Sequence, residues 1–140
     1  MTEDFEGGMG SFRASSGGTK HVVQDKGRSG LVNIQEDSSA SSNIDLKGKT
    51  YSTFKVVFSF LTLYMDDDDS FCFEFKSNSS GWKRSPDTCW SCDFTNKRWE
   101  DMSFEFDAPN TESLEIRFQC ISDHKHDDVL IDKVSMEAKV

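Results

Sequence analysis

The chain of 140 residues carries 16 Lys and Arg against 25 Asp and Glu, which gives a formal net charge of -9 at pH 7. Nucleic acid and membrane insertion are therefore not expected, because this charge repels polyanions and no apolar run approaches the roughly 20 residues needed to span a bilayer. The length predicts one domain over residues 1–140, which we expect to be a module of a larger protein.

The first part of the chain predicts short strands separated by polar turns. Apolar residues indicate strands at Phe12–Ala14, His21–Val23 and Leu31–Gln35, and the Gly-containing stretch Asp25–Gly30 is typical of a loop. The serine-rich stretch Ser38–Ser42 has low complexity and is short enough to be a connecting loop.

Two longer runs organise the middle of the chain. In Thr53–Met65 and Ser70–Lys76, apolar side chains alternate with polar ones, which is the period of a half-buried strand. We interpret them as neighbouring antiparallel strands, with a β-bulge after Phe60, where the alternation slips. Four acids, Asp66–Asp69, join the two runs. A solvated acidic turn is favoured there over a second cation site, because successive side chains in a turn point in different directions.

Three further strands complete a fold without helices. Alternation predicts strands at Met102–Phe106, which Ala108–Asn110 ends, at Leu114–Cys120 and at Val129–Ala138. No segment has sustained helical periodicity. About nine or ten strands with frequent turn signals predict an all-β fold, an antiparallel β-sandwich of the jelly-roll type.

Several stretches of this pattern resemble a known group of domains. They are Asp4–Gly8, Phe58–Phe60, Asp69–Phe71, Leu114–Cys120 and Asp128–Val134. Together they resemble jelly-roll domains related to carbohydrate-binding modules, to galactose-binding-like domains and to MAM-type adhesion domains. The resemblance covers most of the chain. It implies a β-sandwich, an extracellular or cell-surface location and a non-catalytic role as part of a larger protein.

The resemblance also implies a structural calcium ion, which many such domains hold between an N-terminal acid, a loop and an acid of the last strand. The matching positions are Glu6, Asp25 in the loop Asp25–Ser29, and Asp132. Asp132 interrupts an apolar strand, where an unpaired carboxylate is costly unless a cation or hydrogen bonds meet it. Calcium binds six to eight oxygens from carboxylates and carbonyls. The alternative is that Glu6 and Asp132 are solvent-facing acids near strand ends.

Cys89 and Cys92 have the spacing of a local disulfide or of half a zinc site. His124 and His126 would supply the two missing zinc ligands, since the strand directions place their loop at the same end of the sandwich. A redox role would need the strand-to-helix context of a thioredoxin fold, which the sequence lacks. The local disulfide is favoured over zinc.

Cys72 and Cys120 fall on opposite faces of their strands. Cys72 alternates with Phe71 and Phe73, whereas Cys120 shares a face with Phe118. These two cysteines cannot easily pair across the core, so we expect each to be a buried thiol, which is the common state of a strand cysteine.

Trp82 and Trp90 are the candidate ligand-binding residues, because flat aromatic rings stack on sugar faces. Both lie in the irregular region Ser77–Arg98, and binding residues concentrate in loops carried by a rigid scaffold. We expect both rings to be exposed. The alternative is that Trp82 covers the open edge of a sheet. The same alternative places Trp99, which lies beside the next strand, in the core.

These observations predict a non-catalytic, calcium-stabilised module that binds a glycan or polysaccharide. The alternative is a structural or adhesion module that contacts extracellular proteins through its faces or edges. A hydrolase or metal enzyme is disfavoured, because the sequence has no Gly-rich phosphate loop, nucleophile elbow or strong zinc signature. The start of the chain does not resemble a signal peptide, so we expect either an intracellular protein or a mature domain that carries an initiator Met. The expected extracellular location rests on the resemblance and, weakly, on the glycosylation sequon Asn78–Ser80.

Overall fold

A computed structural model of the chain describes residues 2–15, 18–66, 68–78, 80–84, 89–91, 96–122 and 127–139. Within these ranges the chain forms strands and no helix. The strands are β1 (Thr2–Glu3), β2 (Arg13–Ala14), β3 (Thr19–Asp25), β4 (Arg28–Gln35), β5 (Ser38–Ile44), β6 (Tyr51–Leu63), β7 (Ser70–Ser77), β8 (Cys89–Ser91), β9 (Glu100–Thr111), β10 (Leu114–Ile121) and β11 (Asp128–Lys139). The described residues accordingly contain no helix that could cross a membrane.

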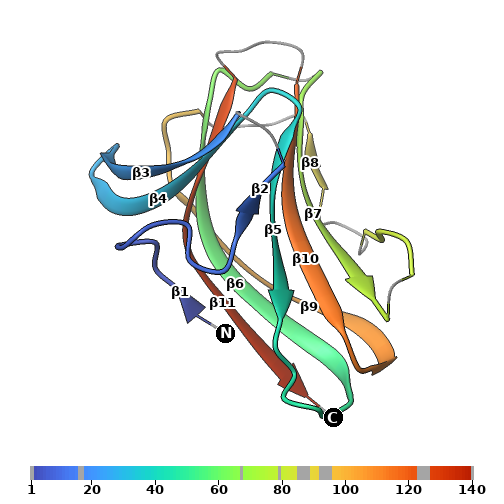
Figure 1. Cartoon of the computed structure of the whole chain (residues 1–140). Coiled ribbons are helices and arrows are strands. Elements are labelled where there is room, and N and C mark those ends of the chain that lie inside the picture. Colours follow the sequence, from blue (N-terminus) through green and yellow to red (C-terminus); the bar gives the residue numbers. More distant parts are fainter. Residues whose placement is uncertain are drawn as a thin grey trace.

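The strands form two sheets that pack face to face (Figure 1). Sheet A has the order β3-β4-β11-β6-β9, with β1 added against β11, and sheet B has the order β2-β5-β10-β7-β8. Every named pair of neighbouring strands is antiparallel. The predicted antiparallel β-sandwich of the jelly-roll type is confirmed.

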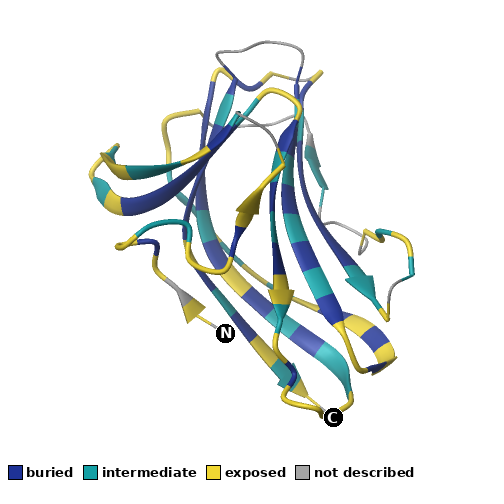
Figure 2. Cartoon of the chain, viewed as in Figure 1, coloured by how far each residue is buried: buried dark blue, intermediate teal, exposed yellow. Residues whose placement is uncertain are grey.

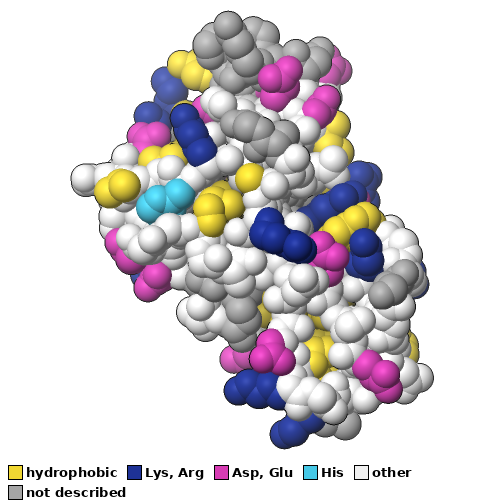
Figure 3. Space-filling view, viewed as in Figure 1, with side chains coloured by type: hydrophobic (Ala, Val, Ile, Leu, Met, Phe, Trp, Pro, Cys, Tyr) yellow, Lys and Arg dark blue, Asp and Glu magenta, His cyan; other side chains and the backbone are white. Residues whose placement is uncertain are grey.

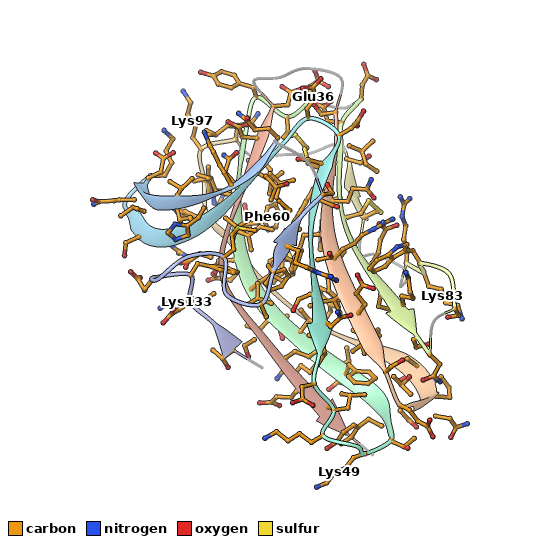
Figure 4. All side chains as sticks on the ribbon, viewed as in Figure 1. Glu36, Lys49, Phe60, Lys83, Lys97 and Lys133 are labelled. Carbon is orange, nitrogen blue, oxygen red and sulfur yellow. A yellow bond between two sulfur atoms is a disulfide. The ribbon has the colours of Figure 1, made fainter. Side chains whose placement is uncertain are left out.

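Phenylalanine fills the space between the sheets. Phe58 of β6, Phe71 and Phe73 of β7, and Phe118 of β10 are each 1% exposed or less. The rings of Phe58 and Phe118 lie 4.8 Å apart between centroids and so join the two sheets. Figure 4 shows Phe60 in the same interior, and Figure 2 shows buried residues alternating with less buried ones along β5 and β10. The inward face of sheet B therefore forms part of the core.

The hairpin expected from Thr53–Met65 and Ser70–Lys76 is wrong. Strand β6 lies in sheet A between β11 and β9, whereas β7 lies in sheet B between β10 and β8. The chain thus crosses from one sheet to the other around Asp66 and Asp69. Alternation shows that one face of a strand is buried, and this holds for both sheets of a sandwich, so it cannot identify the neighbouring strand.

The β-bulge expected after Phe60 is also wrong, because the pairing of β6 keeps its register there. Leu61 and Leu63 lie on the outward face of sheet A and pack with Leu31 and Leu130 in a second apolar cluster. Val22 and Trp99 pack against this cluster. The alternation changes because both faces of β6 are covered at this end. The nearby register shift lies in β11, between Asp132 and Ser135.

Two segments expected to interrupt the sheets belong to strands. Ser38–Ser42 is part of β5, which pairs with β2 on one side and β10 on the other. Its inward side chains are small, and Ala40 and Ser42 are 1% and 0% exposed. Pro109 lies within β9, at the edge of sheet A, where a missing N–H is tolerated. Low side-chain volume hid β5 from the sequence pattern, and Pro109 hid the last residues of β9.

Candidate functional site

The outward face of sheet B carries polar side chains in rows that run across the strands. The first row is Arg13, Ser41, Arg117 and Glu74, and the second is Asn43, Glu115 and Lys76. Neighbouring strands lie about 4.8 Å apart, so four strands give a row of about 15 Å. A row of this length can contact an extended ligand at several points.

Beyond the edge of β7, the segment with Trp82 and Arg84 extends this surface. Lys83 pairs with Phe75 through the backbone, and Figure 4 shows Lys83 beside the end of β7. We name the resulting set of side chains the charged face: Arg13, Glu74, Lys76, Trp82, Arg84, Glu115 and Arg117. Figure 3, which looks onto sheet B, shows Lys and Arg side chains gathered around hydrophobic ones over β7 and β10.

Glu74 is the buried centre of the charged face. Its side chain is 6% exposed, and its two oxygens accept hydrogen bonds from Nε of Arg117 at 2.7 Å and Nε of Arg84 at 2.9 Å. Arg117 stands directly opposite Glu74 in the pairing of β10 with β7. Charge-assisted bonds of this kind are stronger than neutral ones. Glu74 therefore fixes both guanidinium groups on the surface.

Trp82 lies between the two rows. The guanidinium carbon of Arg117 is 4.2 Å from the centroid of its ring, and Nζ of Lys76 is 4.8 Å from it. Both distances are within the range of cation–π attraction. Glu115 links the other ends of the face, because its oxygens lie 3.8 Å from Nζ of Lys76 and 3.5 Å from Nη2 of Arg13. The aromatic ring and both carboxylates thus hold four cations in place.

Sequence reasoning named Trp82 but missed the other members of the charged face. The signal was present, because Glu115 and Arg117 occupy outward positions in Leu114–Cys120, as Glu74 and Lys76 do in Ser70–Lys76. Alternation identified these strands, but it gave no pairing. Only the register places Arg117 beside Glu74, and Glu115 beside Lys76.

The expectation that Trp82 and Trp90 are both exposed is wrong, since each side chain is only partly accessible. Trp90 packs against the core, where its ring stacks on Phe71 at 5.4 Å and lies 5.6 Å from the ring of Phe60. Trp99 is also partly buried, which agrees with the alternative that placed it in the core. It packs on the second apolar cluster and donates a hydrogen bond from Nε1 to the carbonyl of Lys26 at 3.0 Å.

Glu6 and Asp132, two of the acids expected to bind calcium, line one pocket of about 470 Å³ together with Arg28, Ser29 and Lys133. Oδ1 of Asp132 is buried without a hydrogen-bond partner among the described residues, which is costly. Ser29 donates a hydrogen bond to Glu6 at 2.9 Å. Arg28 approaches Oδ2 of Asp132 at 3.3 Å, so a cation already contacts one side of this carboxylate.

Asp25, the third expected ligand, does not line this pocket. It accepts a hydrogen bond from the backbone N–H of Lys26 at 2.8 Å and forms an ion pair with the Lys26 ammonium at 3.4 Å. Across the described ranges, no three His, Cys, Asp or Glu side chains gather as a metal site. The pocket therefore holds two carboxylates, those of Glu6 and Asp132, and the Ser29 hydroxyl.

The acidic turn is less solvated than expected. Asp66 and Asp68 are exposed, but Asp69 is 1% exposed and its Oδ2 accepts a hydrogen bond from the backbone N–H of Asp66 at 2.9 Å. Burial raises the pKa of Asp69 to about 6, with the negative charges of Asp127 and Asp66 acting in the same direction. Asp67 lies outside the described residues.

Cys89 forms a disulfide with Cys72, with a sulfur–sulfur distance of 2.09 Å, and this replaces the local pairing expected with Cys92. The two cysteines are direct partners in the pairing of β7 with β8. Cys72 is therefore not a free thiol, contrary to expectation. Cys120 is a free, buried thiol as expected, and burial raises its pKa to about 12.

Three members of the expected zinc site, Cys92, His124 and His126, lie outside the described residues. The fourth, Cys89, is bound in the disulfide to Cys72. A disulfide sulfur has no thiolate to offer to zinc. The four-ligand site is therefore incompatible with this covalent state.

Neither a protein-family model nor a curated protein matches the sequence. Solved structures do match. The CBM22-1 xylan-binding domain from Paenibacillus barcinonensis Xyn10C is 10% identical, with a TM-score of 0.73, and the alignment covers 100% of this chain and 94% of that one. TmCBM61 in complex with beta-1,4-galactotriose is 13% identical, with a TM-score of 0.69 and coverage of 95% and 92%. The carbohydrate-binding module CBM36 in complex with calcium and xylotriose is 12% identical, with a TM-score of 0.62 and coverage of 98% and 99%. The chain therefore has the β-sandwich fold of these carbohydrate-binding modules.

Proposed function

We propose that this domain is a non-catalytic carbohydrate-binding module whose ligand lies along the charged face of sheet B. The observation that carries the proposal is the row of Arg13, Ser41, Arg117 and Glu74, which places hydrogen-bonding groups across four strands beside the ring of Trp82. Hydroxyl, amide and guanidinium groups can all bind sugar hydroxyls. The similar folds of sugar-binding modules support the proposal.

Trp82 and Trp90 have different roles in this proposal. Trp82 contacts the ligand at the edge of the charged face and supports Arg117 and Lys76 beneath it. Trp90 anchors the edge strand β8, because its ring is packed against Phe71 and Phe60. Loss of Trp82 should therefore weaken binding, and loss of Trp90 should mainly weaken folding.

We further propose that calcium stabilises the fold by binding between Glu6 and Asp132. The unpartnered Oδ1 of Asp132 supports this assignment, as does the calcium found with the similar CBM36 fold. The Ser29 hydroxyl and water would complete the oxygen ligands that calcium requires. Asp25 lies outside the pocket, so its effect on calcium binding would be indirect. It pairs with Arg28 at the turn between β3 and β4 and would help to hold that turn in place.

The domain is proposed to work outside the cell or at its surface. The disulfide between Cys72 and Cys89 supports this location, because disulfides persist in oxidising compartments. A structural or adhesion role is the second candidate. Among the described residues, the exposed large apolar side chains are Val23, Val57 and Tyr64, which come from separate positions in β3, β6 and the segment after β6. This favours the glycan reading over contacts made through one broad apolar patch.

The test is a thermal melt of the domain in chelator, in calcium, and in calcium with a panel of soluble polysaccharides. A ligand that binds the native state raises the melting temperature by mass action. Calcium should raise it, and one or more glycans should raise it further in the unmodified domain but not in Trp82→Ala. Trp99→Phe is the control for loss of an indole elsewhere. No response to any glycan would contradict the binding proposal, and identical melts in chelator and calcium would contradict the calcium site.

A further inference from the structure

The charged face holds a surplus of positive charge on an acidic chain. Four cations (Arg13, Lys76, Arg84 and Arg117) surround two carboxylates (Glu74 and Glu115), so the balance is 4 − 2 = +2, against -9 for the whole chain. The remaining outward positions of β5, β7 and β10 add no charge, because they hold Ser, Asn, Gln, Ile and Cys side chains. The surplus is therefore a local property of this face.

The contacts within the charged face leave its cations able to bind another anion. Arg84 and Arg117 both donate from Nε to Glu74. The terminal Nη groups of each guanidinium therefore make no hydrogen bond to that carboxylate. Arg13 is 62% exposed and Arg84 is 50% exposed. Arg117 is held over the ring of Trp82 and by Glu74, which reduces the entropy it would lose when it binds a ligand.

We infer that the glycan bound by this face is acidic and carries uronate carboxylates. This inference rests on the proposed glycan-binding function and specifies its ligand class. Guanidinium groups match the planar, two-oxygen geometry of a carboxylate, and the face already binds two carboxylates of its own. A uronate polymer presents carboxylates at intervals between hydroxyl groups. Arg13 and Arg84 would bind the carboxylates, while Ser41 and Asn43 lie between them for the hydroxyl groups.

The net charge of the chain does not oppose such binding at short range. Exposed charges are screened beyond about 8 Å at physiological ionic strength, so a ligand lying on the charged face is affected mainly by that face. The acidic remainder of the surface instead limits non-specific binding of polyanions at low salt. Recognition should therefore depend on the four cations rather than on bulk charge.

The experiment compares uronate-containing polysaccharides with the same polymers after chemical reduction of their carboxyl groups. Glucuronoxylan, alginate and polygalacturonate are tested by isothermal titration calorimetry at low and physiological salt. At least one native polymer should bind about 10-fold or more tightly than its reduced form. Arg13→Gln and Arg84→Gln should each lower that affinity about 3- to 10-fold. Arg98→Gln is the matched control, because Arg98 is 69% exposed and pairs with Glu100 elsewhere.

Each outcome separates this inference from the proposed function. Equal affinity for native and reduced polymers would overturn the uronate inference and leave glycan binding intact. Binding to no polymer, acidic or neutral, would overturn both. Equal loss in Arg98→Gln, or equally tight binding of dextran sulfate, would show bulk charge attraction and overturn carboxylate recognition. Circular dichroism of each variant checks that exposed Arg→Gln changes leave the fold unaltered.

Discussion

Arg117 and Glu74 are direct partners across β10 and β7, and Nε of Arg117 lies 2.7 Å from Oε1 of Glu74. A second cation, Arg84, binds the other oxygen of Glu74, so this single carboxylate pairs with two guanidinium groups at once. Glu74→Gln should therefore lower the free energy of unfolding by about 2 kcal/mol, because it leaves two neighbouring cations without their shared anion. Urea denaturation followed by fluorescence measures this change.

Glu115→Gln is the control for Glu74→Gln. Glu115 also contacts two cations, but at 3.5 and 3.8 Å and with a side chain that is 22% exposed. Solvent screens such a pair, so the expected loss is about 0.5 kcal/mol. Equal losses in the two variants would show that burial of Glu74 adds nothing to its ion pairs.

The disulfide between Cys72 and Cys89 should stabilise the fold, because it closes a loop between two residues that are 17 positions apart in the sequence. The double variant Cys72→Ser, Cys89→Ser is expected to lose about 3 kcal/mol of unfolding free energy, since the unfolded chain regains the entropy that the bond removes. Chemical denaturation under non-reducing conditions gives the difference. Mass spectrometry of a non-reduced digest should recover a peptide pair that contains Cys72 and Cys89.

Cys92→Ser distinguishes this bond from the local pairing that the spacing of Cys89 and Cys92 had suggested. If the bond joins Cys72 to Cys89, the variant keeps the linked peptides and its stability still falls when a reductant is added. Recovery of free Cys72 in the unmodified protein would refute the bond.

Cys120 should resist alkylation at pH 8, because burial raises its pKa to about 12 and keeps it a thiol.

Alternation predicted the fold class correctly because it depends on a local property, the burial of every second side chain. It identified the inward residues of Leu114–Cys120 and Ser70–Lys76, and these are buried as expected. It could not assign neighbouring strands, because this depends on how the chain crosses between sheets. Strand β5 was missed for another reason, since its inward residues, such as Ala40 and Ser42, are too small to give an apolar signal.

The candidate site was less predictable than the fold. Trp82 lies beside the cations of the charged face, whereas the ring of Trp90 packs on Phe71, and the sequence pattern did not distinguish these two environments. The charged face depends on residues 43 positions apart, as Arg117 and Glu74 are, and no local pattern links them. Glu6 and Asp132 were placed together by the resemblance, and the structure brings them to one pocket.

Asp69 should make the fold less stable as the pH rises from about 4 to about 6. Its pKa is near 6 in the folded chain because it is buried, against an ordinary value of 3.8. The folded state therefore binds a proton more tightly than the unfolded state, and this stabilisation is fully present below pH 4 and lost above pH 6. The loss is on the order of 2 kcal/mol. Asp69→Asn should remove this component and be more stable than the unmodified domain at pH 7.5.

The measurement is the difference in unfolding free energy between Asp69→Asn and the unmodified domain at pH 4.5 and pH 7.5. Subtracting the two unfolding free energies at each pH removes the contribution of the other acids, because those acids are present in both proteins. Asp68→Asn is the matched control for loss of a carboxylate in the same turn, since Asp68 is exposed, and it should not reproduce the gain that Asp69→Asn shows at pH 7.5. A difference for Asp69→Asn that does not change with pH would contradict the assignment.

Gly30 and Gly27 should respond very differently to substitution by alanine, although both have positive φ angles, +67° and +80°. A side chain at Gly27 meets nothing within 4 Å, so Gly27→Ala carries only the backbone strain, about 1 kcal/mol. A Cβ at Gly30 would lie 2.7 Å from the carbonyl oxygen of Asp4 and 2.9 Å from the backbone nitrogen of Glu6. These backbone atoms must move, which adds about 2 kcal/mol.

The Gly30 substitution also tests the proposed calcium site, because the displaced segment carries Glu6 away from Asp132. In Gly30→Ala, calcium should no longer raise the melting temperature. Gly27 itself lines the pocket, so the control is Gly48→Ala: Gly48 has a φ of +73°, lies outside the pocket and has nothing within 4 Å of an added Cβ, and its variant should keep the response of the unmodified domain. The two variants differ in what they displace and share the strained backbone, so general destabilisation cannot explain a selective loss. A full calcium response in Gly30→Ala would show that the ion binds without Glu6, and Asp132→Asn would then identify whether the remaining carboxylate holds it.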